Sequence, residues 1–164
     1  MTETTTAAHL STSGFDLTAP TQAERARLEA SLSREERDVL LHHGTEAAFC
    51  GGLLDNKQDG VYACRLCGLP LFQARTKFES GTGWPSFFAP FDEAHVTAVR
   101  DTSHGMVRVE TRCARCGSHQ GHLFPDGPPP TRDRYCINSV SLSFVANGQP
   151  LPDPLGRGDR LQPG

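Results

Sequence analysis

Cys113-Ala-Arg-Cys116-Gly117 is the stretch of sequence that decides the fold, because it repeats the pattern of Cys64-Arg-Leu-Cys67-Gly68 earlier in the chain. Two sulfurs three positions apart in a tight turn reach one ion, and two such turns complete the tetrahedron of thiolates that structural zinc prefers. The glycine after each pair tolerates the positive φ that such a turn needs. The sequence therefore predicts one structural Zn2+ that ties two parts of a domain together. Its predicted ligands are Cys64, Cys67, Cys113 and Cys116.

Two other interpretations of these motifs are a pair of redox-active sites and a coincidence of spacing. A thioredoxin-type redox site is a single Cys-x-x-Cys motif beside a βαβ unit, whereas this chain carries two motifs. Four thiolates leave no open coordination position, so the expected ion supports the structure and does not bind substrate.

The composition indicates one globular, turn-rich domain. The 164 residues are 37% hydrophobic and include 16 Gly and 12 Pro, and a single core needs roughly 100 to 150 residues. The formal net charge is −3 and the sequence pI is about 6.1, so no global positive charge attracts a nucleic-acid backbone. We expect a monomer without a nucleic-acid partner.

The sequence also favours a cytoplasmic protein. No apolar run approaches the roughly 20 residues of a membrane span, and Met1-Thr-Glu-Thr-Thr-Thr lacks the basic and apolar regions of a secretory signal. In a reducing compartment, six cysteines are more often metal ligands or redox-active thiols than a disulfide framework.

Helix signals fill residues 21–44. A short helix with Leu28 and Leu32 on one side comes first, and a second helix starts at the capping box of Ser33 and Glu36. Gly44 stands where this second helix is expected to end.

Strand signals begin near residue 60. Residues 106–113 and 139–144 alternate apolar and polar side chains, as half-buried strands do, and residues 61–64 and 95–99 are weaker strand candidates. We therefore predict a single domain over residues 21–146, with its β core at about 60–146. Residues 1–20 are predicted to form a mobile tail and residues 147–164 a flexible one.

Cys136 and Cys50 remain once the metal ligands are assigned. A lone cysteine is more often a small buried hydrophobe than a nucleophile. Cys136, however, follows Arg134 and a proline-rich loop, and an imidazole or cation near a thiol favours the reactive thiolate. Its stretch also contains His119, His122 and Asn138. We predict that Cys136 is a nucleophile.

The two histidines are either surface or core residues, spare metal ligands, or members of a site. Four cysteines already satisfy a zinc ion, and two histidines three apart can present donors to one side of a pocket. Trp84 is the only tryptophan and stands in a Gly/Pro loop, where its indole either fills the core or lines a pocket.

Four longer motifs carry a family resemblance. They read Gly81-Thr-Gly83-Trp84-Pro85-Ser86-Phe87, His104-Gly105-Met106-Val-Arg108, Cys113-x-x-Cys116-Gly-Ser-His119-x-Gly121-His122-x-Phe124-Pro125-Asp126-Gly127 and Arg134-Tyr135-Cys136-Ile-Asn138-Ser139. Together they resemble the zinc-containing type B methionine sulfoxide reductases, which act on the R epimer. The resemblance extends from about Ser33 to Phe144.

The resemblance implies a mainly β fold of two antiparallel sheets with short N-terminal helices and a structural zinc site of four cysteines. It also implies that Cys136 attacks the sulfoxide sulfur of methionine-R-sulfoxide, protein-bound or free, and becomes a sulfenic acid. The residues that match the positioning and protonation of the departing oxygen are His119, His122 and Asn138. The residues that match the substrate-binding positions or their supports are Trp84, Phe124, Asp126 and Arg134.

Two residues depart from the family pattern. Many members carry a resolving cysteine in the Gly-x-Gly-Trp loop, where this chain has Thr82. We therefore expect Cys50, on a glycine-flanked segment, to form a disulfide with Cys136 that thioredoxin reduces. The alternative is that Cys50 is a packing residue and an external thiol recycles the enzyme. Gln120 replaces a usually apolar residue, which leaves the packing between the histidines open.

Two functions of other classes compete with a reductase. A zinc-stabilised binding module has the same scaffold, but it does not require a cysteine, two histidines and an asparagine in one stretch. A Cys-His hydrolase is disfavoured because no nucleophile turn at the start of a helix accompanies Cys136.

Overall fold

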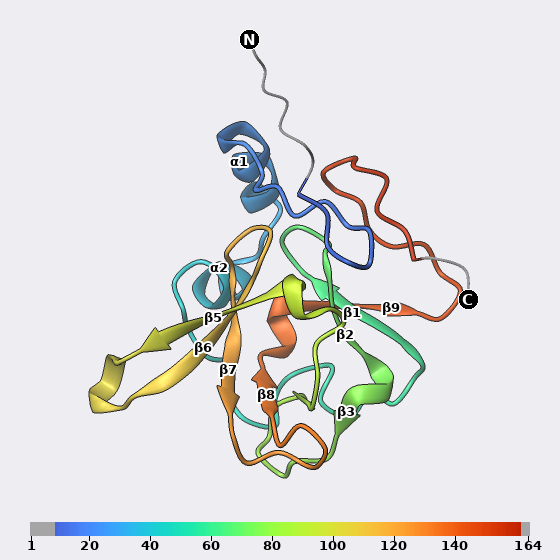
Figure 1. The fold of residues 1–164 in the computed structure, drawn as a ribbon. Helices are drawn as coiled ribbons and strands as arrows, with labels where there is room; N and C mark the ends of the chain where they lie inside the picture. Colours follow the sequence, from blue (N-terminus) through green and yellow to red (C-terminus); the bar gives the residue numbers. More distant parts are fainter. Residues whose placement is uncertain (1–8, 162–164) are drawn as a thin grey trace.

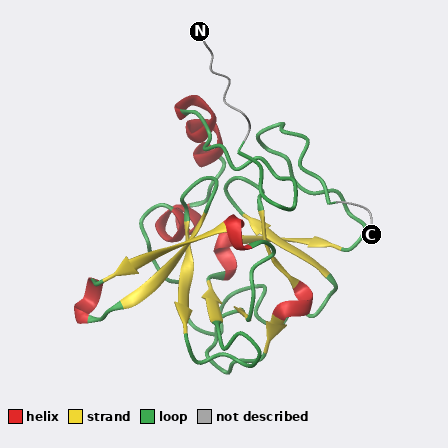
Figure 2. Cartoon of the chain, in the orientation of Figure 1, coloured by secondary structure: helices red, strands yellow, loops and turns green. Residues whose placement is uncertain are grey.

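The computed structural model describes residues 9–161, which form two antiparallel sheets, two α-helices and short 3-10 turns (Figure 1; Figure 2). One sheet has the strand order β2-β1-β9 and the other the order β3-β4-β8-β7-β6-β5. The strands are β1 Gly60–Cys64, β2 Pro70–Gln73, β3 Lys77–Phe78, β4 Ser86–Phe87, β5 Val96–Asp101, β6 Arg108–Cys113, β7 His119–Phe124, β8 Arg134–Ile137 and β9 Leu142–Ala146. The helices are α1 Gln22–Ala30 and α2 Arg34–Leu40, with 3-10 turns η1 Ala74–Thr76, η2 Glu93–His95, η3 Ser103–Gly105 and η4 Ser139–Ser141. The predicted fold class, mainly β with short N-terminal helices, is confirmed.

Both helices begin with a capping box. The Ser33 side chain accepts a hydrogen bond from the Glu36 amide, and the Glu36 carboxylate accepts one from the Ser33 amide, as predicted. The helix α2 ends at Leu40, before the predicted end at Gly44. The chain leaves it through His43, a non-glycine residue with φ +58°.

Aromatic side chains join the two sheets. Phe72 of β2 stacks on Phe87 of β4 with 4.4 Å between ring centroids, and Tyr62 of β1 meets the edge of Phe87 at 5.1 Å. Tyr135 of β8 lies 5.5 Å from Phe72. Because all four rings are buried, they form the centre of a core between the sheets.

The predicted strand at residues 106–113 exists, but its burial does not follow the predicted alternation, because Glu110 and Thr111 on opposite faces are both buried. The strand β6 begins at Arg108, and Val107 and Val109 are exposed whereas Glu110 is buried. Figure 1 shows the reason: the hairpin of β5 and β6 extends beyond the body of the domain. Burial in β6 therefore begins only where the strand reaches that body.

The alternation predicted for residues 139–144 is wrong in its first half. Residues Ser139–Ser141 form the turn η4, in which Ser141 is fully buried and Val140 is only partly buried. The hydroxyl group of Ser141 donates to the His119 carbonyl at 3.0 Å, so a hydrogen bond satisfies the buried serine. The strand β9 starts at Leu142.

The terminal segments pack on the domain, which corrects the predicted loose tails for residues 9–20 and 147–161. Phe15, Leu17, Leu151 and Leu155 belong to the buried core cluster. In Figure 1 the blue N-terminal segment and the red C-terminal segment lie on the same side of the molecule. Residues 1–8 and 162–164, the remaining parts of the two predicted tails, lie outside the described residues.

A buried ion pair fastens the C-terminal segment to the second Cys-x-x-Cys turn. Arg115 donates to Asp159 at 2.8 Å, and both side chains are almost completely buried. Arg115 also donates to the carbonyl of Cys67 at 2.7 Å. The guanidinium group thus links the two cysteine turns with the end of the chain.

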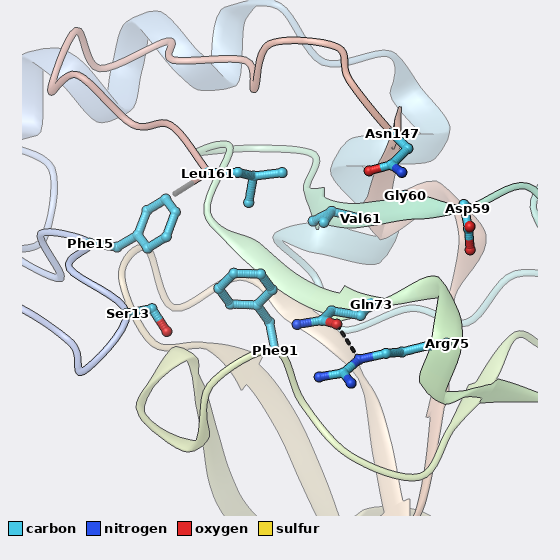
Figure 3. A pocket seen from close by; sticks show the side chains of 10 residues that line it. All are labelled: Ser13, Phe15, Asp59, Gly60, Val61, Gln73, Arg75, Phe91, Asn147 and Leu161. Carbon is cyan, nitrogen blue, oxygen red and sulfur yellow. Dashed lines mark hydrogen bonds between the residues drawn. The ribbon is translucent and has the colours of Figure 1, made fainter. Parts of the chain in front are cut away.

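A hollow of about 460 Å³ lies where the terminal segments meet the small sheet (Figure 3). Aromatic and aliphatic side chains, among them Phe15, Phe91 and Leu161, line one part of it, and Gln73 and Arg75 line another. Its lining contains no cysteine or histidine, so this hollow is separate from the sulfur and imidazole groups. Within residues 9–161, no helix has the length and apolar character of a membrane span.

Candidate active site and metal centre

The two Cys-x-x-Cys motifs form two turns of the same kind. Cys64 ends β1 in the small sheet, and Cys113 ends β6 in the large sheet. In each turn the glycine amide donates to the carbonyl of the first cysteine at 2.8 Å, from Gly68 to Cys64 and from Gly117 to Cys113. Both glycines have positive φ, +84° and +76°. The centre therefore takes two ligands from each sheet.

The four sulfurs fit a tetrahedral metal ion. The Sγ atoms of Cys64 and Cys116 lie 3.6 Å apart, and those of Cys67 and Cys113 lie 3.5 Å apart. A disulfide would bring two sulfurs to about 2.05 Å, whereas four thiolates about 2.3 Å from a zinc ion lie about 3.8 Å from one another. All four side chains are buried, and their ligand atoms lie within 4.8 Å of one another. The predicted ligands are thus together and able to bind a metal.

Arg115 and Gln120 donate to these sulfurs, and the Ser118 hydroxyl group lies 3.4 Å from Cys64 Sγ and 3.1 Å from Cys116 Sγ. Arg115 Nε lies 3.5 Å from Cys67 Sγ, and Gln120 Nε2 lies 3.6 Å from Cys64 Sγ. Hydrogen bonds of this kind stabilise thiolate charge in a buried cluster. Gln120, the departure from the family pattern, is therefore accommodated by facing the cysteine cluster.

A β-bulge at Gln120 places both histidines on one face of the large sheet. In the pairing of β6 with β7, Thr111 lies opposite Gly121 and Arg112 lies opposite His119, which leaves Gln120 as the extra residue. Without a bulge, residues three apart on a strand point to opposite faces. The bulge turns Gln120 toward the sulfurs, and His119 joins His122 on the other face.

Cys136 lies on the same face as the histidines. It is directly opposite His122 in the pairing of β7 with β8, and directly opposite Ser86 in the pairing of β4 with β8. Residues directly opposite each other in antiparallel strands share a face. The predicted nucleophile and imidazoles therefore come from two neighbouring strands, and not from loops.

Each histidine forms a hydrogen bond to a carboxylate through one ring nitrogen. His119 Nδ1 lies 2.6 Å from Glu110 Oε2, and His122 Nε2 lies 2.8 Å from Asp101 Oδ2. Burial alone would raise the pKa of Glu110, but the hydrogen bonds that it accepts hold this pKa at about 2. Hydrogen bonds from Ser103 and His122 hold the pKa of Asp101 well below its usual range. Both carboxylates are thus ionised at neutral pH.

The Cys136 thiol is protonated at rest. Burial raises its pKa above the ordinary value, and the hydroxyl group of Thr82 and the guanidinium group of Arg134 only partly oppose this effect. Thr82 Oγ1 lies 4.0 Å from Cys136 Sγ. The cation beside the thiol, Arg134, therefore lowers the Cys136 pKa as expected, but desolvation outweighs it.

Glu46 connects Trp84 with Asn138. Trp84 Nε1 donates to the Glu46 carbonyl at 3.0 Å, and the Glu46 amide donates to Asn138 Oδ1 at 2.9 Å. Asn138 Nδ2 donates in turn to the carbonyl of Gln120 at 3.1 Å. Asn138 therefore fastens the bulge to the segment that supports the indole.

Arg134 is held by an aromatic ring and a carboxylate. Its guanidinium carbon lies 4.4 Å from the centre of the Phe124 ring, and two of its nitrogens donate to Asp126 at 2.8 and 3.1 Å. A stacked and bidentate guanidinium group has a fixed direction. Arg134 thus stays beside Cys136, whose pKa it lowers.

Cys50 is exposed and lies on a segment beside the Trp84 loop. The amide of the preceding residue, Phe49, donates to the Gly83 carbonyl at 2.7 Å. Phe49 is also exposed and has φ +65°, a conformation that is costly for a bulky residue. The exposure of Cys50 argues against the alternative that it is a buried packing residue.

The structure adds Glu110, Asp101, His43 and Glu46 to the residues predicted from sequence. A polar hollow of about 570 Å³ has both histidines, Glu110, Asp101 and His43 in its lining. The alternation along residues 106–113 places Glu110 on the polar side of a strand, and this is the one sign in the sequence that Glu110 could belong to a site. The pairing of β6 with β7, which puts Glu110 on the same face of the sheet as the histidines, could not be predicted from sequence.

We predict from the raised pKa that the alkylation of Cys136 by iodoacetamide is slow at neutral pH and accelerates as the pH rises. In a Cys50→Ser variant, the rate should still be increasing at the ordinary cysteine pKa of about 8.5, because the thiolate fraction still grows there. A Cys136→Ser, Cys50→Ser double variant gives the background rate. A rate that reaches its plateau below pH 7.5 would contradict the buried, protonated thiol.

Comparison with known proteins identifies the family. The chain matches the SelR domain over residues 32–146. It is 76% identical over 157 residues to the peptide methionine sulfoxide reductase MsrB of Caulobacter vibrioides, a match that covers 96% of this chain and 99% of that protein. The MsrB of Xylella fastidiosa is 63% identical over 145 residues, with 88% and 94% covered, and that of Escherichia coli is 51% identical over 126 residues, with 76% and 92% covered. The chain belongs to the SelR family of MsrB-type peptide methionine sulfoxide reductases.

Proposed function

We propose that the chain reduces the R epimer of methionine sulfoxide in oxidised proteins and that Cys136 is its nucleophile. The observation that carries the proposal is that Cys136 shares one sheet face with two imidazoles, each oriented by an ionised carboxylate. A sulfoxide sulfur becomes a good electrophile only as its oxygen gains a proton, so the nucleophile needs proton carriers beside it. The reductase domain is assigned to residues 21–146.

The reaction oxidises Cys136 by two electrons. The sulfur of Cys136 attacks the sulfoxide sulfur and forms an S–S bond, while the S–O bond breaks and the protonated oxygen leaves as water. This water then attacks the Cys136 sulfur, the S–S bond breaks, and methionine is released with Cys136 as its sulfenic acid. The thiol proton ends on that oxygen, so a thiol and a sulfoxide become a sulfenic acid and a thioether. His119 and His122 carry this proton in the proposal.

Aromatic residues on one side and donors on the other select the epimer. Trp84 is assigned to the substrate methyl group, with Phe124 as its neighbour, and the imidazoles are assigned to the oxygen. The support is the placement of the indole by Glu46 and of Phe124 against Arg134. The opposite epimer would direct its oxygen toward the aromatic side, where it would lose its hydrogen bonds.

We assign the resolution of the sulfenic acid to Cys50. Its thiol displaces water from the Cys136 sulfenic acid to form a disulfide, which thioredoxin reduces by exchange with its own dithiol. The supporting observations are the exposure of Cys50 and the hydrogen bond between its segment and the loop that carries Thr82 and Trp84. The other four cysteines are buried together in the metal centre.

We assign Zn2+ to the centre formed by the four buried cysteines. The support is the all-thiolate donor set, which suits zinc and leaves no position for substrate. When bound, the ion supplies structural cohesion and takes no part in the redox step. We further propose that the enzyme acts as a monomer in the cytoplasm, where thioredoxin keeps exchangeable thiols reduced.

The proposed function predicts epimer selectivity with dithiothreitol as reductant. The R epimer of a peptide-bound methionine sulfoxide should be reduced with multiple turnovers, and the S epimer should remain, because only one epimer points its oxygen at the imidazoles. Chiral chromatography of the remaining sulfoxide measures both. Reduction of the S epimer alone, or of neither, would overturn the proposal, and Cys136→Ser gives the uncatalysed background.

The assignment of Cys50 makes a separate prediction. Cys50→Ser should lose thioredoxin-linked turnover while it still reduces one equivalent of substrate, because the sulfenic acid forms but cannot become a disulfide. Rapid-mix chromatography counts the methionine formed for each enzyme molecule. Thr82→Ala is the matched control, since it changes the other side chain near Cys136 and leaves both thiols. Unchanged thioredoxin-linked turnover in Cys50→Ser would rule the assignment out.

A further inference from the structure

We propose that Glu110 is the positioning residue of His119 and that His43 completes this arrangement by binding the same carboxylate oxygen. The inference rests on the role proposed above for His119 in proton transfer. It adds two residues, neither a predicted site residue, that act through His119 and do not touch the substrate.

The contacts of Glu110 determine where the histidine protons lie. Its Oε2 atom lies 2.6 Å from His119 Nδ1 and 2.7 Å from His43 Nδ1, and its Oε1 atom accepts a bond from Arg112 at 2.8 Å. An ionised carboxylate accepts hydrogen bonds and cannot donate them. Each imidazole must therefore carry a proton on Nδ1.

The other nitrogen of His119 is then available for chemistry. The His119 side chain is only 2% exposed, yet its Nε2 atom has no hydrogen-bond partner among the described residues. Burial lowers the pKa of His119 despite the neighbouring carboxylate, so the ring is neutral at rest. A neutral ring with its proton on Nδ1 has a free electron pair on Nε2, which can take a proton and pass it on.

His43 reaches Glu110 from a strained backbone. It follows α2 with φ +58°, a conformation that few non-glycine residues adopt. Its side chain is 49% exposed, yet it turns toward Glu110, and its ring centroid lies 5.4 Å from that of His119. His43 thereby covers the carboxylate on its solvent side, which keeps water from competing for the oxygen that holds His119.

Hydrogen bonding explains this cluster better than metal binding does. Two nitrogens and one oxygen bound to the same zinc ion at tetrahedral angles would lie about 3.3 Å from one another. The observed N···O distances of 2.6 and 2.7 Å are those of charge-assisted hydrogen bonds. Arg112 also neutralises the carboxylate that a cation would need.

The charged groups around His119 and His122 come from the neighbouring strands β5 and β6. Arg108 and Arg112 come from β6, and Asp101 from the end of β5 holds His122. His119 therefore faces His122 and His43, with Glu110 as its own carboxylate partner. Without Glu110, either nitrogen of His119 could carry the proton.

The test uses Glu110→Gln in the full chain, because glutamine keeps the shape and removes the charge. Long-range 1H–15N NMR of the histidine rings should show His119 with its proton on Nδ1 in the wild type and a changed tautomer population in the variant. In single-turnover experiments, the rate constant for methionine formation should fall about 10- to 100-fold with KM changed less than threefold, since general acid–base catalysis contributes about 100- to 10,000-fold.

His43→Asn provides a second variant that leaves the core intact. It should reduce the single-turnover rate constant about threefold to tenfold, while its exposed neighbour His42→Asn is the matched control and should stay within twofold of the wild type. An unchanged His119 tautomer and an unchanged rate constant in folded Glu110→Gln would overturn the proposal, and so would equal effects of the His43 and His42 substitutions. The NMR measurement needs no activity, so an inactive wild type would overturn the proposed function and leave the positioning to be decided by the tautomer.

Discussion

The fold depends on the convergence of two turns, one from each sheet, at four buried sulfurs. Cys64 and Cys67 extend from β1, and Cys113 and Cys116 extend from β6. The constraint reaches the site through Gln120. Its side chain donates to Cys64 Sγ, and its carbonyl accepts both the backbone and the side-chain amide of Asn138. The residue that forms the bulge is therefore bonded to the metal centre on one face of the sheet, while the bulge presents the histidines on the other.

The candidate site combines a protonated thiol, Cys136, with two imidazoles whose orientation is fixed by carboxylates. Burial keeps the proton on Cys136, and the carboxylates of Glu110 and Asp101 keep one nitrogen of each imidazole occupied. In the proposed mechanism, proton transfer from the thiol to the sulfoxide oxygen takes place on one face of the sheet and conserves charge in a poorly solvated site. A resting thiolate is unnecessary in this arrangement, and the protonated form is less prone to oxidation.

Sequence analysis predicted those features that local chemistry determines. The spacing of the cysteines, the capping box at Ser33, and the resemblance in the motifs around Cys136 led to the cluster of four cysteines, the second helix and the family, which the structure and the comparisons confirm. Features that depend on pairing between distant segments were not predictable. The strands β7 and β8 carry the candidate site, yet the bulge in β7 breaks the period-two pattern that identifies a strand. Glu110 and Asp101 became visible only with the register, and the terminal segments carry too few apolar residues to reveal that Phe15 and Leu155 join the core.

The most direct test of the claim that the four sulfurs hold the two sheets together is to measure the zinc content and the amide NMR spectrum of the same protein. The purified chain should contain one equivalent of zinc measured by mass spectrometry, and its amide spectrum should be well dispersed. Removal of the metal by a chelator under reducing conditions should collapse that dispersion, including the signals of His119 and Asn138, because the bulge is bonded to the centre. A well-dispersed spectrum from protein that holds less than half an equivalent of zinc would contradict the account.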